Sequence, residues 1–371
     1  MLGFHKLEFQ NLAFRLVIKI ESSSYSIVIS DDIFDKLSVF LESHFPDHQI
    51  FILVDENTEK HCLPLLSWIE NERLTSGDAL IVPVGEESKS IDLLSGLAES
   101  LIELGASRKS IIINLGGGVV TDLGGFLAST FKRGVPFINV PTSLLAMVDA
   151  SSGGKTGVNL GIYKNQLGTF CFPEAVFCGL NLLETLPKRE LKSGYVEALK
   201  HGLIANSQIW NSLIEIDLEQ IPSKKIIAQS IEVKNRITLI DPFEKGERKK
   251  LNFGHTIGHA VESLSHINRE PLLHGEAIAI GIVMESFLSV FHAKLPKQEL
   301  DEIRIFIFNQ FDKYQIKKSD FETLIELMRS DKKNENEGIN FTLLNEIGNS
   351  KIDFNLSEEE VTQALEWYIT I

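Results

Sequence analysis

Short apolar runs alternate with longer amphipathic stretches through the first half of the chain. The runs occupy residues 14–20, 25–30, 51–55, 79–84, 111–115 and 136–141. A helix-like segment follows Asp31 and Asp32, and helical segments also separate the later runs. Continuous apolar strands that alternate with helices are typical of a parallel, doubly wound sheet. The pattern therefore predicts a Rossmann-like α/β domain over residues 1–175.

The pattern changes after about residue 176. Long segments with helical spacing cover 188–217, 222–240, 253–293 and 297–329, and only 339–344 still has the pattern of a strand. Ser357 followed by Glu360 is typical of a capping box at the start of a terminal helix. We therefore expect a second, mainly α-helical domain over residues 176–371, which binds the metal and the substrate.

Length and composition are those of a soluble enzyme with two domains. The 371 residues are 43% hydrophobic and 23% charged, which excludes disorder as the main state. A net charge of −15 argues against a nucleic-acid-binding surface. Since no apolar run approaches the ~20 residues of a membrane span and the polar start is unlike a signal peptide, we expect a cytoplasmic protein. Cys62, Cys171 and Cys178 predict neither a disulfide framework nor a cysteine-bound zinc.

Histidines are concentrated in LNFGHTIGHAVESLSHINREPLLHGEAIA, residues 251–279. His255 and His259 are about one helical turn apart and would share a face, while His274 opens a second apolar helix. Upstream, Glu197 lies in another helical segment. One carboxylate and two imidazoles are the ligand set of a catalytic zinc with an open coordination position. These residues predict a metal site.

Two glycine-rich stretches have features of phosphate-binding sites. The predicted strand 111–115 runs into a triple glycine at 116–118 and then a helix, which lets backbone amides and the helix dipole meet a pyrophosphate. The pattern is not GxGxxG, and a tight turn without a ligand is the alternative. Residues 149–170 are rich in glycine and lysine, with Lys155 and Lys164 flanking a predicted hairpin. This stretch is typical of a phosphate cradle or of solvated loop lysines.

Ordered motifs along nearly the whole chain resemble the 3-dehydroquinate synthase family of sugar-phosphate cyclases. They are GGGVVTDLGGF, FKRGVPFINVPTSLLAMVDASSGGKTGVN, KNQLGTF, TLPKRELKSGYVEALKHGLI, LNFGHTIGHAVE and LLHGEAIAIGIVME. The resemblance implies a dehydroquinate synthase-like fold and a lyase that needs NAD and zinc. Its substrate would be 3-deoxy-D-arabino-heptulosonate 7-phosphate, converted to 3-dehydroquinate and phosphate in the shikimate pathway of aromatic amino-acid biosynthesis. The implied course is transient oxidation by NAD, phosphate elimination, re-reduction and intramolecular aldol closure.

The resemblance also implies the residues of the site. The ligands of zinc, or of cobalt, would be Glu197, His255 and His274, and His259 would instead assist proton transfer near the phosphate. The NAD contacts would be Asp55, Asn57, Glu86, Lys89, Gly117, Gly118, Val119, Asp122, Thr142, Ser143, Lys164 and Thr185. The substrate contacts would be Arg133, Asp149, Lys155, Asn165, Lys200, Lys234, Arg248, Asn252 and one lysine of the pair Lys332 and Lys333, which we assign to Lys333.

The implied substrate contacts divide between the two anionic groups of the heptulosonate phosphate. Lys155, Asn165, His259 and Arg133 would serve the phosphate. Lys234, Arg248 and Asn252 would serve the carboxylate. Arg133 would reach the phosphate site of a neighbouring subunit, so the resemblance also implies a homodimer.

Structural roles remain open for several of these residues. Asp55 could cap a helix, Glu86 and Lys89 could form an ordinary i,i+3 pair, His259 could be a core histidine, and Lys234 could be a surface lysine. The chain also departs from the family pattern at Thr121, Ser143, Ser152 and Tyr163. These departures leave the NAD affinity and the loop detail open.

Three other functions compete with the leading interpretation. Another sugar-phosphate cyclase would act on a substrate without a carboxylate, and the carboxylate contacts argue against it. A metal-dependent polyol dehydrogenase would release NADH. Such enzymes commonly have Asp in place of Glu197 and lack the phosphate-side lysines. A non-catalytic NAD-binding protein would not need an intact metal triad.

Overall fold

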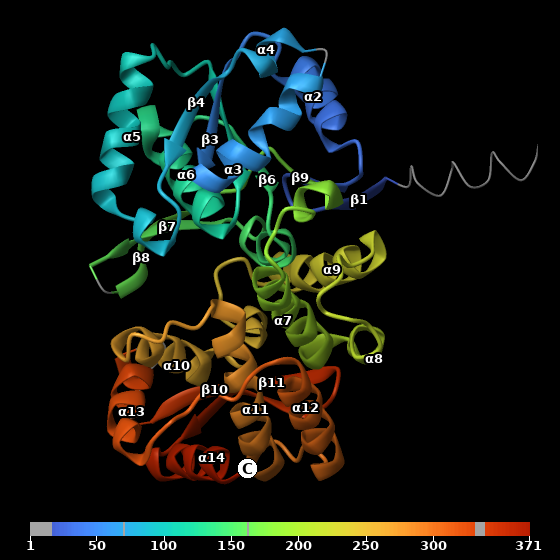
Figure 1. Cartoon of the computed structure of the whole chain (residues 1–371), viewed down its shortest axis with the longest axis vertical. Coiled ribbons are helices and arrows are strands. Elements are labelled where there is room, and N and C mark those ends of the chain that lie inside the picture. Colours follow the sequence, from blue (N-terminus) through green and yellow to red (C-terminus); the bar gives the residue numbers. More distant parts are fainter. Residues whose placement is uncertain (1–16, 70, 162, 331–337) are drawn as a thin grey trace, which may run out of the picture. The chain divides into compact units, whose positions relative to one another are not determined.

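The computed structural model describes residues 17–69, 71–161, 163–330 and 338–371. These residues form two compact units (Figure 1), each treated separately below. The first unit runs to Pro187 and also includes Ile221–Ile231, whereas the second consists of Lys188–Gln220 and Glu232–Ile371. Lys332 and Lys333 lie outside the described residues.

The first unit is built around a seven-stranded sheet with the order β1-β2-β9-β6-β5-β3-β4. β1 and β2 pair antiparallel at one edge, and the other pairs are parallel. The predicted Rossmann-like domain is thus confirmed, with an antiparallel edge added. The strands are β1 (Ile18–Glu21), β2 (Ser26–Ile29), β3 (Gln49–Asp55), β4 (Asp78–Val82), β5 (Ser110–Gly116), β6 (Phe137–Pro141) and β9 (Ala175–Cys178).

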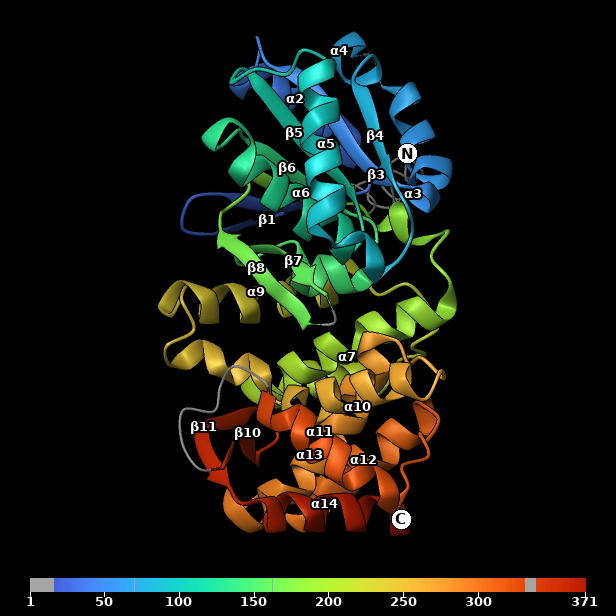
Figure 2. The same cartoon turned by 90° about the vertical axis from the view of Figure 1, so that its left-hand side faces the viewer.

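Helices cover both faces of this sheet. In Figures 1 and 2, α5 (Ile91–Glu103) and α6 (Gly118–Thr130) lie on one side, and α2 (Ile33–His44) and α4 (Glu72–Thr75) lie on the other. α3 (Glu56–His61) follows β3 directly. Because the sheet is covered on both faces, β5, β6 and β9 are buried along their whole length. β7 (Lys155–Leu160) and β8 (Tyr163–Phe170) form the predicted hairpin, separate from the sheet.

The second unit is mainly helical, as predicted. A C-terminal hairpin, β10 (Ile339–Glu346) with β11 (Asn349–Leu356), is its β-structure within the described residues. The helices are α7 (Lys188–Ala205), α8 (Ser207–Leu213), α10 (His255–Ile267), α11 (His274–His292), α12 (Lys297–Gln310), α13 (Phe321–Ser330) and α14 (Glu358–Thr370). α9 (Lys224–Ile240) contributes residues to both units.

α11 is the central helix of the second unit. Within the described chain, it is the one helix long and apolar enough to cross a membrane, but 72% of its most apolar window is buried inside the protein. Its apolar side chains pack in a core with residues of α10, α13, α14 and the hairpin. The composition of α11 is therefore explained by its place in this core.

Local sequence signals located most elements, and the exceptions have physical causes. Ser357 caps α14 in a capping box as predicted. The expected helix 188–217 breaks at Asn206, whose side chain accepts a hydrogen bond from the amide of Gln208 and caps α8. Two strands were not predicted: β9, which is as short as β1 and β2, and β11, whose alternation of polar and apolar residues is itself a strand signal. The expected domain boundary after residue 175 would divide β9, a strand of the first unit's sheet.

Glycines bring α10 and α11 into close contact. Gly254, which precedes α10, has a φ of +79°, and its carbonyl oxygen lies against Gly281 of α11, where a Cβ would overlap it. Gly258 also meets the backbone of α11 at Ala277 and Ile278. This approach is possible because none of the three glycines has a side chain, and it fixes the start of α10.

We expect Gly281→Ala to destabilise the protein by about 1–3 kcal/mol or more, because the new methyl group would meet backbone atoms that cannot rotate away. Chemical denaturation followed by circular dichroism would measure the change. Gly96→Ala in α5 is the matched control, since a Cβ there meets nothing within 4 Å. The control should be neutral or stabilising by up to about 1 kcal/mol. Equal midpoints for the two variants would contradict the close approach.

Candidate active site

Three contacts, one helical turn apart on α7, hold it against the start of α11. Arg189 forms two hydrogen bonds of 2.7 Å with the carboxylate of Glu276. One turn later, the Ser193 hydroxyl accepts a hydrogen bond from the amide of Gly275 at 3.0 Å. After one more turn, Glu197 faces His274, with 3.7 Å between Oε1 and Nε2. The contacts of Arg189 and Ser193 therefore set the position of His274 relative to Glu197.

Glu285 on α11 determines where α10 begins. Its fully buried carboxylate accepts hydrogen bonds from the amides of Gly254 at 2.6 Å and Ile257 at 3.0 Å. These amides lie in the first turn of α10, where a carboxylate interacts favourably with the helix dipole. His255 is the first residue of this helix. The sequence analysis missed Glu285, although a lone acid in the apolar run of α11 was an available signal.

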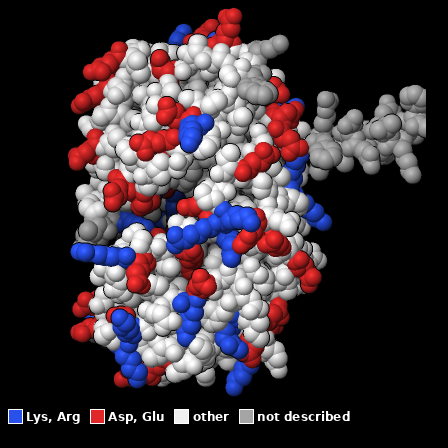
Figure 3. Space-filling model, in the orientation of Figure 1, with Lys and Arg blue, Asp and Glu red and all other residues white. Residues whose placement is uncertain are grey.

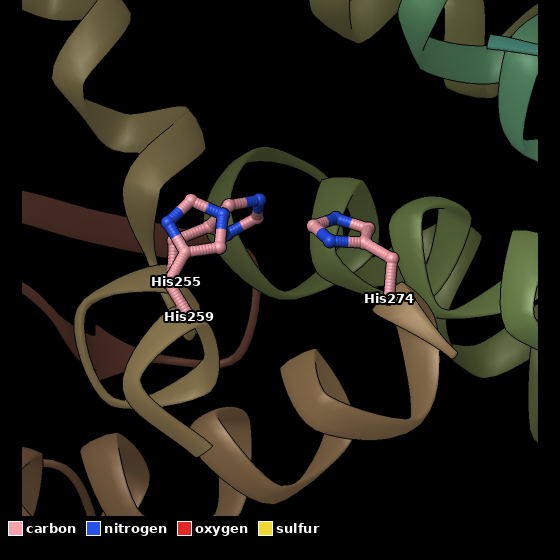
Figure 4. A group of neighbouring side chains, drawn as sticks. All are labelled: His255, His259 and His274. Atoms are coloured by element: carbon pink, nitrogen blue, oxygen red, sulfur yellow. The ribbon is translucent and has the colours of Figure 1, made fainter. Parts of the chain in front are cut away.

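His255, His259 and His274 converge in the second unit (Figure 4). One nitrogen of each ring belongs to a group whose atoms all lie within 4.8 Å of one another. The Nε2 atoms of His255 and His274 lie 3.6 Å and 3.7 Å from the same oxygen, Oε1 of the fully buried Glu197. Two ligands of one tetrahedral zinc are separated by about 3.3–3.5 Å. The arrangement therefore fits a single metal ion, with His259 beside it.

The other nitrogen of each imidazole is engaged away from this point. His255 Nδ1 donates to the carbonyl of Phe253 at 3.2 Å, and His274 Nδ1 faces Glu262 Oε2 at 3.5 Å. Hydrogen bonds at Nδ1 fix the tautomer and leave Nε2 as the metal-binding atom. Glu262 was not predicted as a site residue, because nothing in its sequence position indicates a contact with His274.

The two imidazoles differ in their electrostatic surroundings. Burial and the positive charge of Lys200 hold the pKa of His255 well below its usual value, so this ring is neutral. Burial also disfavours the charged form of His274, but hydrogen bonds to Glu197 and Glu262 outweigh it and raise the pKa to about 9. The carboxylates thus create a negative potential at His274 that suits a bound cation.

The residues expected at the substrate carboxylate lie just upstream of α10. The backbone amides of Lys245, Gly246 and Arg248 donate to the carboxylate of Asp241, which fixes the turn that leads into η6 (Glu247–Asn252). Arg248 is 3% exposed and donates from Nη1 to the carbonyl of Pro242 at 2.6 Å. Asn252, at the end of η6, donates to Glu244 at 2.7 Å.

Three of the cations assigned to the substrate, Lys200, Lys234 and Arg248, are buried, although the protein as a whole is acidic. Figure 3 shows Asp and Glu side chains spread over the surface. In contrast, Lys200 is 1% exposed and Lys234 is 5% exposed, so Lys234 is not a surface lysine. Lys200 also forms an ion pair with Glu197. Buried cations act at short range and are little screened by salt, so they can attract an anion despite the net charge of −15.

In the first unit, the expected NAD contacts gather at one edge of the sheet. β3, β5 and β6 are parallel neighbours, so Asp55, Gly117 and Thr142 lie at or just beyond their carboxyl ends. β4 lies on the other side of β3 from β5, which makes the ends of β3 and β5 a topological switch point, the usual place for a nucleotide. Asn57, Val119, Ser143 and Thr185 follow β3, β5, β6 and β9 respectively.

The triple glycine opens α6. Gly117 precedes the helix, and no side chain caps this end of α6. A Cβ at Gly117 would come no closer than 3.6 Å to Ser143 Oγ, and one at Gly118 would lie 3.3 Å from Ala150. Packing within the protein therefore does not require glycine at Gly117, and the uncapped amides can receive a pyrophosphate. Asp55, in contrast, also has the structural role that the sequence left open, because its Oδ1 caps α3 through the amides of Asn57 and Thr58.

Lys89 connects several of the expected contacts. Its buried ammonium donates to Asp122 Oδ2 at 2.8 Å and to Asn165 Oδ1 at 2.5 Å, and lies 3.7 Å from Glu86. Burial disfavours its charge, but Asp122 and Glu86 outweigh this and raise the pKa of Lys89. The i,i+3 pair of Glu86 and Lys89 is therefore real and belongs to a larger network.

The remaining expected contacts of the first unit lie in turns and in the β7–β8 hairpin. Asp149 lies in a π-helical turn, η4 (Ala146–Ala150), and Lys155 begins β7 with an exposed side chain. Arg133 is exposed and has a φ of +69°, next to Lys132 with a φ of +48°. Consecutive left-handed residues other than glycine are costly and often mark functional positions. Lys164 lies on β8 next to Tyr163, which pairs with Leu160 at the end of the hairpin away from Lys155.

Comparison with known proteins places the chain in a family. A family model described as the N-terminal part of 3-dehydroquinate synthase matches residues 79–193, and its C-terminal counterpart matches residues 194–334. The 3-dehydroquinate synthase of Parabacteroides distasonis is 41% identical over 349 residues, which are 93% of this chain and 98% of that protein.

Solved structures share the fold. A 2-deoxy-scyllo-inosose synthase complexed with carbaglucose-6-phosphate, NAD⁺ and Co²⁺ superposes with a TM-score of 0.81 at 22% identity, covering 94% of this chain and 99% of that one. A 2-epi-5-epi-valiolone synthase from Streptomyces hygroscopicus with NAD⁺ and Zn²⁺ bound gives a TM-score of 0.79 at 20% identity, covering 96% and 99%. These two share the architecture, and the two family models extend over most of the sequence; the chain belongs to the 3-dehydroquinate synthase family.

Proposed function

We propose that the chain is a cytoplasmic lyase that converts 3-deoxy-D-arabino-heptulosonate 7-phosphate to 3-dehydroquinate and phosphate, a step of the shikimate pathway. The observation that carries the proposal is the convergence of His255 and His274 on one oxygen of Glu197. It occurs in a chain that matches a relative named for this activity along almost its entire length. NAD and a divalent metal ion, zinc or cobalt, would be the cofactors.

Glu197, His255 and His274 would hold the metal, since the separations of their atoms suit one ion. When bound, the metal supplies Lewis-acid polarisation of substrate hydroxyls and NAD supplies reversible hydride transfer. Lys200 neutralises part of the charge of Glu197, and Glu262 and Phe253 keep the two imidazoles oriented. The uncapped amides at Gly118 would receive the pyrophosphate of NAD.

The substrate would be oriented by its two anionic ends. Arg248, Lys234 and Asn252 would bind the carboxylate. The backbone amide of Arg248 is fixed by Asp241 and its buried guanidinium donates to the carbonyl of Pro242, which suits it to two parallel hydrogen bonds. Lys155, Asn165 and His259 would bind the phosphate, and His259 can exchange a proton near the leaving group. The chain would thus contribute mainly positioning and electrostatic stabilisation. Asp149 belongs to the same proposed set.

A homodimer is part of the proposal, with Arg133 reaching the partner's phosphate site. The exposed, left-handed backbone at Arg133 supports this role, since it directs a cation outward at an energetic cost.

The assay that tests the proposal follows phosphate release and NADH absorbance together. With the heptulosonate phosphate, NAD and zinc, phosphate should be released in many turnovers while NADH does not accumulate. Chelation should stop turnover, and zinc or cobalt should restore it. His274→Ala should lose metal and activity, whereas His266→Ala, an exposed histidine of α10, should retain both. One NADH formed per turnover would instead identify a dehydrogenase.

Exchange between subunits tests Arg133. Arg133→Ala and His274→Ala should each be nearly inactive alone. Mixed dimers would contain one intact site, so refolding the two variants together should recover roughly a quarter of the wild-type activity. Absence of recovery in a mixture that forms dimers would place Arg133 in the site of its own subunit, and a monomer in sedimentation equilibrium would refute the assembly.

Arg248 separates the two cyclase functions. Removing one partner of a buried charge pair costs about 2–5 kcal/mol, so Arg248→Ala should weaken the heptulosonate phosphate roughly 30- to 3,000-fold. An analogue without the carboxylate should bind almost as before, and so should NAD. Isothermal titration of both ligands would measure this, with Arg236→Ala on the exposed side of α9 as the control. Equal losses for both ligands would favour a cyclase with a different substrate.

A further inference from the structure

The β7–β8 hairpin contains an irregularity at the residues expected to contact phosphate and NAD. Val158 pairs with Leu167, and Leu160 pairs with Tyr163. Between these pairs, Asn159 alone faces a segment of β8 that contains Lys164, Asn165 and Gln166. A bulge of this kind redirects side chains at a functional site. Here it exposes all three residues of the segment.

The side chain of Asn159 holds the bulge in place. Its Oδ1 accepts a hydrogen bond from the amide of Asn165 at 2.8 Å. Asn165 has a φ of +53°, a left-handed conformation that is rare outside glycine and needs support from its surroundings. Because the regular ladder is interrupted here, the side chain of Asn159 replaces the missing strand partner of this amide.

Asn159 also contacts the segment that carries Glu86 and Lys89. Its Nδ2 donates to Glu86 Oε1 at 2.9 Å, and its backbone amide donates to the carbonyl of Lys89 at 2.8 Å. Lys89 in turn donates to the side chain of Asn165 at 2.5 Å. Asn159, Glu86, Lys89 and Asn165 therefore form a closed ring of hydrogen bonds.

We propose that Asn159 is a positioning residue that fixes the bulge for phosphate binding and holds Glu86 and Lys89 for NAD. The inference rests on the proposed function of Asn165, Glu86 and Lys89. An amide suits this position because it presents an acceptor to Asn165 and a donor to Glu86 at the same time. Aspartate would keep the acceptor but would place a second carboxylate against Glu86. Alanine would remove both interactions.

A double-mutant cycle tests whether Asn159 acts through Asn165. Asn159→Ala and Asn165→Ala should each raise KM for the heptulosonate phosphate roughly tenfold. The first removes the acceptor of the Asn165 amide, and the second removes the side chain that is proposed to bind the phosphate. Because both changes disrupt one unit, the double variant should be within about twofold of Asn165→Ala alone. The kcat of Asn159→Ala should fall less than KM rises.

Separate variants test the second contact. Asn159→Asp should weaken NAD binding more than phosphate binding, because the new carboxylate would repel that of Glu86. The double variant Asn159→Asp with Glu86→Gln should recover part of the lost NAD affinity, since glutamine presents a donor to the new carboxylate. Thr169→Val is the matched control, because Thr169 bonds Ser129 and Thr156 at the far end of the same hairpin. It should lower the melting temperature without changing either KM or the NAD affinity.

Independent, multiplying effects of Asn159→Ala and Asn165→Ala on KM would overturn the inference. The inference would also be overturned if Asn159→Ala, like Thr169→Val, lowered the melting temperature without changing KM or the NAD affinity, because Asn159 would then serve stability alone. An assay of the wild-type enzyme distinguishes failure of the proposed function from failure of the role of Asn159. If it releases no phosphate from the heptulosonate phosphate, the proposed function fails. If it does and the cycle is additive, only the role of Asn159 fails.

Discussion

A carboxylate buried between two helices is the constraint on which the second unit depends. Glu285 satisfies two amides at the start of α10, and one turn earlier on α11 Gly281 lets the backbone of Gly254 approach. A buried acid is costly unless hydrogen bonds compensate it. Here the compensation comes from the helix terminus that carries His255, so the same interaction stabilises the fold and orients a proposed metal ligand.

Charge balance explains how a cation can be held where two helices begin. His255 and His274 are the first residues of α10 and α11, and the positive ends of two helix dipoles would repel a metal ion. Glu197, Glu262 and Glu285 supply negative charge at this point. Burial lowers the pKa of His274, but Glu197 and Glu262 outweigh it and raise the pKa, whereas burial and the positive charge of Lys200 lower the pKa of His255.

In the first unit, the proposed NAD contacts include backbone amides at strand ends, which tolerate side-chain changes better than a metal site does. Thr121, a departure from the family pattern, is buried and turns its hydroxyl to the carbonyl of Gly118 within α6. Ser143 accepts a hydrogen bond from the amide of Ala146. Both hydroxyls therefore have local partners within the protein.

The sequence by itself determined the α/β half, the helical half and the residues that form the proposed metal and phosphate sites, because hydrophobic period, glycine turns and motif spacing are local signals. The tertiary structure decided which distant groups meet. The insertion of β9 between β2 and β6, the contact of Glu285 with Gly254, and the link from Asn159 to Glu86 were not predicted. The hydrophobic period of a segment predicts which of its faces is buried. Which other segment covers that face depends on how all the segments pack together.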